Sequence, residues 1–274
     1  MTTPADVSAL DVLRTAEPRA KAAAGRAFHA SVLRGTAVTG GTPPLLPARP
    51  DAPELVPPSR VPKRGLGSPS GRAALLHAIA HIELNAIDLS ADMVARFADA
   101  PELAGRRDDF VRTWSRVCDD EARHFLMIEE RLGELGHAYG DFPAHDGLWQ
   151  AARNTAHDIA ARLAIAPLVL EARGLDVTPG MIQRLDSVGD RASADILRVI
   201  YAEEVAHVEA GIIWFRHVAA ARGRDPESYF QSLVREHFKG QVKPPFNVEA
   251  RDRAQFPVDF YAKLAPSDSN LTPC

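Results

Sequence analysis

Cysteine and aromatic residues are scarce in this chain. Cys118 and Cys274 are the two cysteines among 274 residues, too few for the disulfide framework of a small secreted protein. Aromatic residues make up 7%, whereas alanine-rich segments dominate, which favours helix over sheet. We therefore expect an all-α protein in a reducing compartment, with the cytoplasm as its location.

Two further absences exclude classes of protein. No run of about 18 apolar residues occurs, so we expect no membrane-spanning helix, and the N-terminus lacks the apolar core of a signal peptide. A net charge of −4 does not indicate a nucleic-acid-binding surface. Neither membrane nor nucleic acid is expected as a partner, although a transient RNA substrate stays open.

A repeated short motif stands out against this background. Glu121 and His124 are three residues apart, written Glu-x-x-His, and Glu204 and His207 repeat the spacing. Residues three apart lie side by side on one face of a helix, so both side chains can reach one metal ion. A single Glu-x-x-His is common on helices, and the repeat is what makes the motif informative.

Two more glutamates complete a pattern. Glu83 and Glu171 precede the two motifs by 38 and 33 residues. The resulting order, Glu, Glu-x-x-His, Glu, Glu-x-x-His, is the one by which a ferritin-like four-helix bundle holds two iron or manganese ions. The alternative is that these six side chains are surface or salt-bridged groups of an ordinary bundle. The predicted metal ligands are Glu83, Glu121, His124, Glu171, Glu204 and His207.

Apolar periodicity predicts the helices that would carry these ligands. Four core helices are expected over residues 71–98, 107–135, 148–173 and 191–221. Glu83 falls in the apolar stripe of the first helix, where an unpaired carboxylate would be costly, and a metal would offset that cost. In the third helix Ala160 and Ala164 lie beside Glu171, and their small side chains suggest a cavity. Gly174 is expected to end that helix and Thr178-Pro179 to begin a short one.

The remaining segments differ in composition. Residues 35–70 hold nine of the 21 prolines and are predicted to form an extended belt over the bundle, with a free linker as the alternative. Their apolar side chains favour the belt. We expect a helical segment over 1–34, the bundle over 71–222, and an extra helix with an irregular tail over 223–274.

Two roles are considered for each of three other side chains. Tyr201 lies one turn before Glu204, as a buried phenol bonded to a ligand carboxylate or as a redox-active catalytic tyrosine. His77 and His81 are four residues apart and point away from Glu83 by helical count. They are expected to bond to the Pro-rich belt or a neighbouring subunit, with a second metal site as the alternative.

Several longer stretches resemble bacterial ferritin-like proteins grouped as domain-of-unknown-function family 455. Between residues 71 and 247 they read HAIAHIELNAIDL, DDEARHF, AYGDFPAHDGLW, LEARGLDVTPGM, YAEEVAH and KPPFN. The resemblance implies a ferritin-like antiparallel four-helix bundle with a di-metal carboxylate centre, and it names no substrate. More remotely, the ligand order is similar to that of diiron hydroxylases, including the tRNA hydroxylase type, and of rubrerythrin-like peroxidases.

The resemblance also implies roles for the ligands. In the family pattern Glu121 and Glu204 bridge two ions, Glu83 and His124 complete one, and Glu171 and His207 complete the other.

The expected function is therefore a diiron, or manganese or mixed Fe/Mn, oxidoreductase that activates O2 and hydroxylates or oxidises a small organic molecule. It would need an external electron donor, and a homodimer stays open. One alternative is metal oxidation or peroxide scavenging, as in ferritins and rubrerythrins. Another is a metal-stapled helical binding module without catalysis.

Overall fold

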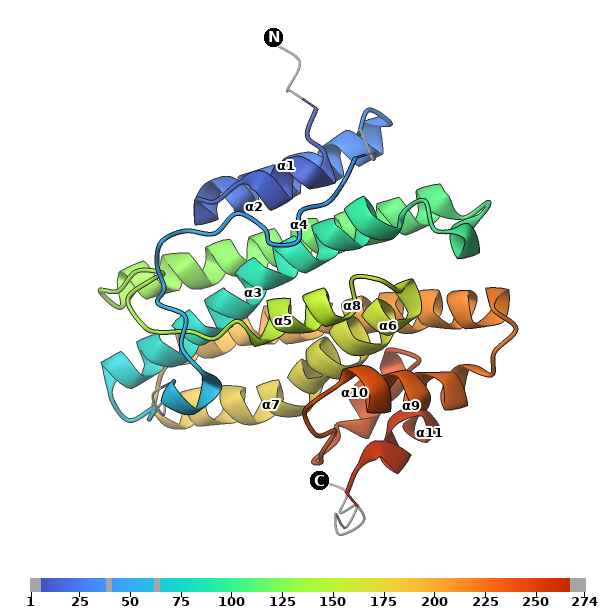
Figure 1. Cartoon of the computed structure of the whole chain (residues 1–274). Helices are drawn as coiled ribbons and strands as arrows, with labels where there is room; N and C mark the ends of the chain where they lie inside the picture. The colour runs from blue at the N-terminus through green and yellow to red at the C-terminus, as the bar shows by residue number, and fades with distance from the viewer. Residues whose placement is uncertain (1–5, 38–40, 62–64, 267–274) are drawn as a thin grey trace. The chain divides into compact units, whose positions relative to one another are not determined.

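The computed structural model describes residues 6–37, 41–61 and 65–266 (Figure 1). Within these ranges the regular structure is helical, and the β-type pairing consists of an isolated bridge between Leu55 and Ala144. The predicted all-α class is confirmed for this part of the chain. None of its helices is long and apolar enough to cross a membrane.

The chain divides into two compact units. The first comprises Met1–Trp149 with Leu185–Ile196, and the second comprises Gln150–Arg184 with Leu197–Cys274. The helices are α1 (Ala9–Arg14), α2 (Pro18–Arg34), α3 (Pro69–Phe97), α4 (Arg107–Glu134), α5 (Gly147–Asn154), α6 (Ile159–Ile165), α7 (Ala172–Ser187), α8 (Arg191–Ala221), α9 (Pro226–His237), α10 (Val248–Arg253) and α11 (Val258–Tyr261). A π-helical segment, η3 (Ala166–Glu171), and the short 3-10 turns η1 (Pro58–Arg60), η2 (Pro101–Leu103) and η4 (Ala262–Leu264) complete the set.

In the first unit α3 and α4 pack along each other, and α1 and α2 pack on them (Figure 1). The predicted helices over 71–98, 107–135 and 191–221 are confirmed to within two residues as α3, α4 and α8. Ser68 caps α3, since its Oγ accepts a hydrogen bond from the Gly71 N–H at 3.1 Å. On α4, Trp114 and Phe125 are buried on the predicted apolar face. Local periodicity was sufficient for these helices.

The third predicted helix, over 148–173, is wrong as a continuous element. Helix α5 ends at Asn154, and α6 begins at Ile159 with the Asp158 side chain accepting from the Ala161 N–H at 2.8 Å. The buried Arg162 holds this break, because it donates to the Thr155 hydroxyl at 3.0 Å and to the Ala152 carbonyl at 2.6 Å. Arg162 belongs to the helix after the break, and it thus supplies hydrogen-bond donors to polar groups around the end of α5.

A widened turn follows the break. Pro167 has no N–H to bond to the carbonyl four residues earlier, and η3 takes the π form over Ala166–Glu171. Helix α8 approaches this turn at Gly211, where an added Cβ would lie 2.6 Å from the Pro167 Cβ. Proline and glycine together therefore permit close contact between η3 and α8.

The predicted helix end at Gly174 and restart at Thr178-Pro179 are also wrong. Helix α7 continues through all three residues. Pro179 cannot bond to the Leu175 carbonyl, but the Asn247 side-chain amide donates to that carbonyl at 3.1 Å. A partner from another part of the second unit replaces the missing helical hydrogen bond.

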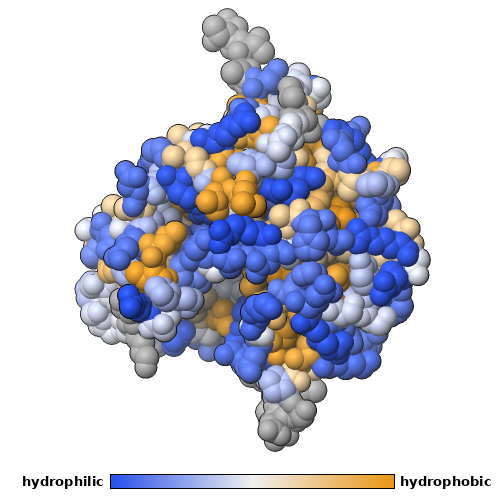
Figure 2. Space-filling model, viewed as in Figure 1, coloured by the Kyte–Doolittle hydropathy of each residue, from blue (hydrophilic) through white to orange (hydrophobic). Residues whose placement is uncertain are grey.

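The described part of the Pro-rich segment lies against the first unit. The Ala48 N–H donates to the Leu13 carbonyl at 2.7 Å, and the Trp149 indole donates to the Leu45 carbonyl at 3.1 Å. These contacts agree with a belt, although the predicted cause is wrong: Leu45 and Leu46 are 65% and 55% exposed. Figure 2 shows apolar patches scattered over a mostly hydrophilic face of the molecule. Main-chain carbonyls, rather than leucine side chains, fix this segment.

The second unit has an aromatic core. Helices α6 and α11 pack on α9, and Phe230 of α9 meets the rings of Phe256 and Phe260 with centroids 5.5 and 5.8 Å apart. Helix α9 is the predicted extra C-terminal helix. The tail after it is more regular than expected, since Asn247 caps α10 by accepting from the Ala250 N–H at 3.2 Å.

Candidate metal centre

Three of the predicted ligands meet in the first unit. Helix α3 supplies Glu83, and α4 supplies Glu121 and His124 from adjacent positions on one face. The His124 Nδ1 lies 3.3 Å from the Glu83 Oε2 and 3.4 Å from the Glu121 Oε2. These side chains have exposed fractions of 4%, 1% and 0%. Two carboxylates and an imidazole are therefore held together away from water.

Burial changes the proton affinity of this cluster. Burial, and then the charge of Glu121, raises the pKa of Glu83 well above its ordinary value. Burial alone would lower the pKa of His124, but its hydrogen bonds to Glu121 and Glu83 raise the pKa to about 11. Both shifts favour a proton held among these three groups in the metal-free protein. A bound cation would replace that proton.

The geometry fits one metal ion. One ligand atom from each of Glu83, Glu121 and His124 can be chosen so that all lie within 4.8 Å of one another. That is close to twice a metal–ligand bond of about 2.0–2.2 Å. Carboxylate oxygen and imidazole nitrogen together suit divalent iron and manganese, and zinc to a lesser extent with so many carboxylates.

The other three predicted ligands belong to the second unit. On α8 the His207 Nδ1 lies 3.3 Å from the Glu204 Oε1, and these side chains are 2% and 14% exposed. Glu171 is half-buried and is the last residue of η3. The Glu-x-x-His motif thus forms the expected local pair in both units, and Glu171 occupies a π-helical turn. Such turns occur frequently at functional sites.

Cys118 lies on the same helix as Glu121. It is fully buried, and burial raises the pKa of its thiol to about 12. Its sulfur faces the Ile87 carbonyl at 3.6 Å. A thiol that stays protonated is a poor metal ligand, so Cys118 acts as a small apolar filler.

Tyr201 is half-buried on α8. Its hydroxyl oxygen accepts a hydrogen bond from the Asn247 Nδ2 at 2.9 Å. The expectation of a phenol bonded to a ligand carboxylate did not include this partner. Because the oxygen accepts from Asn247, the phenolic proton stays available for donation.

His77 and His81 contact the connector after α4, a partner that the sequence did not predict. The Gly140 N–H donates to the His77 Nε2 at 2.8 Å, and the His81 Nδ1 lies 2.8 Å from the Tyr139 hydroxyl. Burial, and then the charge of Arg49, lowers the pKa of His81 to about 4. These histidines hold a loop in place.

Sequence reasoning missed two features. Lys21 and Asp88 form a fully buried ion pair between α2 and α3, with the Arg49 guanidinium 3.7 Å from the same carboxylate. Asn247 bonds both Leu175 and Tyr201. Helical periodicity could not identify Lys21 as the partner of Asp88. The KPPFN stretch that ends in Asn247 was noted without a role.

Comparisons with known proteins agree with the resemblance to family 455. The family model described as "Protein of unknown function (DUF455)" matches residues 14–262. A protein of Haemophilus influenzae, named "Uncharacterized protein", is 44% identical over 214 residues, which cover 76% of this chain and 73% of the relative. No solved structure matches the chain significantly.

Proposed function

The chain belongs to the DUF455 family, and we propose that it is a non-haem di-metal carboxylate oxidoreductase that activates O2. The reaction would hydroxylate or oxidise a small organic substrate. The observation that carries this proposal is the buried cluster of Glu83, Glu121 and His124. Three ionisable groups in an apolar interior are costly unless a cation pairs with them.

The six ligands would serve one centre of two ions. Glu83 and His124 would hold one ion, Glu171 and His207 the other, and the glutamates of the two motifs, Glu121 and Glu204, would lie between them. This assignment rests on ligand order in the sequence and on its similarity to ferritin-like bundles. Two iron ions, two manganese ions or a mixed Fe/Mn pair would supply the redox chemistry when bound.

The chain's own residues have distinct parts in this proposal. Phe125 and Ile128, both fully buried on α4, exclude water from the first Glu-x-x-His. Tyr201 is the candidate catalytic residue, because Asn247 fixes its oxygen and leaves its proton for donation. A small organic substrate, O2 and an external electron donor are the partners the reaction requires.

Metal analysis tests the proposal first. We expect about two iron or manganese ions per chain by elemental analysis of the purified protein, and a change of absorbance when the anaerobic iron(II) form meets O2. Glu121→Gln should lose both. Glu130→Gln is the matched control, since Glu130 is exposed on the same helix, and it should keep both.

Other results would favour the other functions. Absence of bound metal, or a single zinc retained by Glu121→Gln, would refute the di-metal centre and leave a helical binding module. Faster oxidation by hydrogen peroxide than by O2 would favour rubrerythrin-like peroxide scavenging. Steady oxidation of many added iron ions per chain would favour ferritin-like metal handling.

A further inference from the structure

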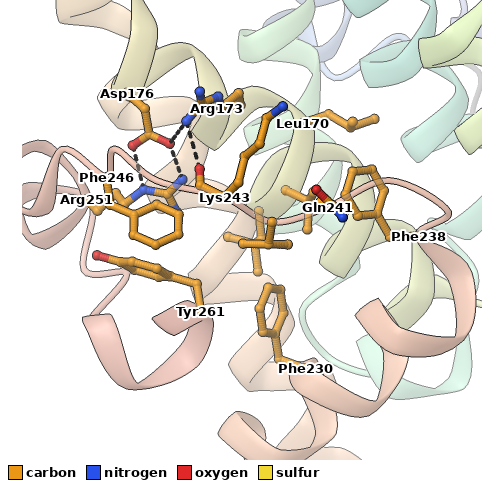
Figure 3. Close-up of a pocket in the computed structure, with 13 residues that line it drawn as sticks. Leu170, Arg173, Asp176, Phe230, Phe238, Gln241, Lys243, Phe246, Arg251 and Tyr261 are labelled. Atoms are coloured by element: carbon orange, nitrogen blue, oxygen red, sulfur yellow. Dashed lines mark hydrogen bonds and ion pairs between the residues drawn. The ribbon is translucent and has the colours of Figure 1, made fainter. Parts of the chain in front are cut away.

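The second unit contains a pocket of about 160 Å³ that is separate from the Glu-x-x-His side chains (Figure 3). Its walls are mostly apolar. Leu168 and Val169 come from η3, Phe230 comes from α9, and Phe238 follows that helix directly. A mostly apolar pocket with a few polar groups is the usual form of a small-molecule site.

The charged groups of this pocket are predominantly cationic. Arg173, Lys243 and Arg251 line it, against the single carboxylate of Asp176 among the described lining residues. The pocket therefore has an excess of two positive charges in a chain whose net charge is −4. This local reversal of charge favours an anionic ligand.

Asp176 cannot neutralise these cations further. Its side chain is fully buried, and it accepts from the Arg251 Nε at 2.9 Å, the Arg251 Nη2 at 2.7 Å and the Asn247 N–H at 2.9 Å. Figure 3 shows this ion pair on one side of the pocket, with Phe238 on the other. Because Asp176 balances the charge of Arg251, the pocket keeps two positive charges, those of Arg173 and Lys243.

Arg173 and Lys243 have N–H donors that a ligand could use. The hydrogen bonds of Arg173 all use Nη1, to the Lys243 carbonyl at 3.0 Å, the Pro245 carbonyl at 3.1 Å and Asp176 at 3.4 Å. Among the described residues nothing bonds its Nε and Nη2, or the Nζ of the exposed Lys243. Guanidinium and ammonium donors next to apolar walls match a carboxylate joined to an apolar chain or ring.

We propose that this pocket binds an amphipathic carboxylate. The apolar part of the ligand lies between Val169, Phe230 and Phe238, and its carboxylate pairs with Lys243 and Arg173. The inference does not depend on the metal centre, because the second unit forms the pocket from its own side chains. The wall residues Leu168 and Val169 nevertheless share η3 with Glu171, so a ligand here contacts the turn that carries a predicted metal ligand.

Calorimetric titration of the full chain tests the proposal with defined probes. Octanoate and 3-phenylpropionate are the anionic probes, and 1-octanol is the matched neutral probe. We expect octanoate to bind at least tenfold more tightly than octanol, and the difference to shrink as salt rises, since Lys243 is exposed to screening.

Three variants locate the site. Lys243→Gln should weaken octanoate binding about tenfold and leave octanol binding unchanged. Leu170→Trp should weaken both ligands by filling the pocket, with circular dichroism confirming that it folds. Lys239→Gln is the control, because Lys239 is an exposed lysine outside the pocket lining, and it should bind octanoate as the unaltered chain does.

The proposal is overturned by any of three results. One is that neither anionic probe binds at millimolar concentration. Another is that octanol binds as tightly as octanoate. The third is that Lys239→Gln weakens binding as much as Lys243→Gln, which would indicate attraction to the general surface.

Discussion

The side-chain amide of Asn247 donates a hydrogen bond to the carbonyl of Leu175 at 3.1 Å. That carbonyl lacks its ordinary helical donor, since the residue four positions later is Pro179. The same Nδ2 also bonds the Tyr201 hydroxyl at 2.9 Å. One asparagine thus completes α7 and fixes the candidate catalytic tyrosine.

Asn247→Asp should therefore destabilise the protein by about 1–3 kcal/mol, the cost of a buried polar group left without its partner. The substitution keeps the Oδ1 that caps α10, and it replaces the Nδ2 donor by a carboxylate oxygen, whose charge beside the Leu175 carbonyl adds to the cost. In a Pro179→Ala background the helix supplies its own N–H, and the cost should fall. Urea unfolding of the four proteins measures both values. If Asn247→Asp cost the same free energy of unfolding with Pro179 in place and in the Pro179→Ala background, the Asn247 hydrogen bond would not depend on the missing N–H of Pro179.

Glu83→Gln should reduce the stabilisation by metal without destabilising the metal-free protein. The pKa of Glu83 is raised by burial and by Glu121. Replacing Glu83 with a neutral amide therefore removes its repulsion with the Glu121 carboxylate. The melting temperature in chelator should stay unchanged or rise. Manganese at 100 times its Kd would stabilise the unaltered chain by about 2.7 kcal/mol, and the variant should gain less.

Glu130→Gln is the control for this comparison and should retain the full gain from manganese. If the melting temperature of Glu83→Gln, measured in chelator, fell markedly, repulsion between the carboxylates of Glu83 and Glu121 would be contradicted.

His81 should make stability depend on pH. Its pKa falls from 6.5 in the unfolded chain to about 4 when folded, so the unfolded chain binds more protons between those values. Stability is complete above about pH 6.5 and is lost as the pH falls towards 4. Between pH 7.5 and 5.0 this group should cost about 2 kcal/mol at about 1.4 kcal/mol per pH unit.

His81→Gln removes that titration, so its loss of stability between the two pH values should be smaller by about that amount. Urea unfolding at both pH values gives the comparison, and the exposed His157→Gln serves as the control. Parallel losses in His81→Gln and the unaltered chain would refute a role for this histidine.

Gly211→Ala should destabilise the protein by about 1–3 kcal/mol through overpacking. The added Cβ would lie 2.6 Å from the Pro167 Cβ, which is closer than two carbon atoms can approach. Gly133→Ala on α4 meets nothing within 4 Å and should stabilise by about 0.5–1 kcal/mol, because alanine favours helix. Thermal melting of the two variants should give shifts of opposite sign. If Gly211→Ala left the melting temperature unchanged, η3 would have to move easily to accommodate the added methyl group.

The sequence by itself determined α3, α4 and α8, and the pairing of each glutamate with the histidine three residues on. Both depend on spacing within one helix, where residues three and four apart share a face whatever the rest of the chain does. The burial of Glu83 followed from its place in an apolar stripe.

Only the tertiary structure decided the remainder. Pro179 stays inside α7 because Asn247, 72 residues from Leu175, supplies a hydrogen bond, and Arg162 satisfies the break before α6. His77 and His81 bond a connector about 60 residues further along. These outcomes depend on which distant group satisfies a polar atom, and helical periodicity carries no information about such partners.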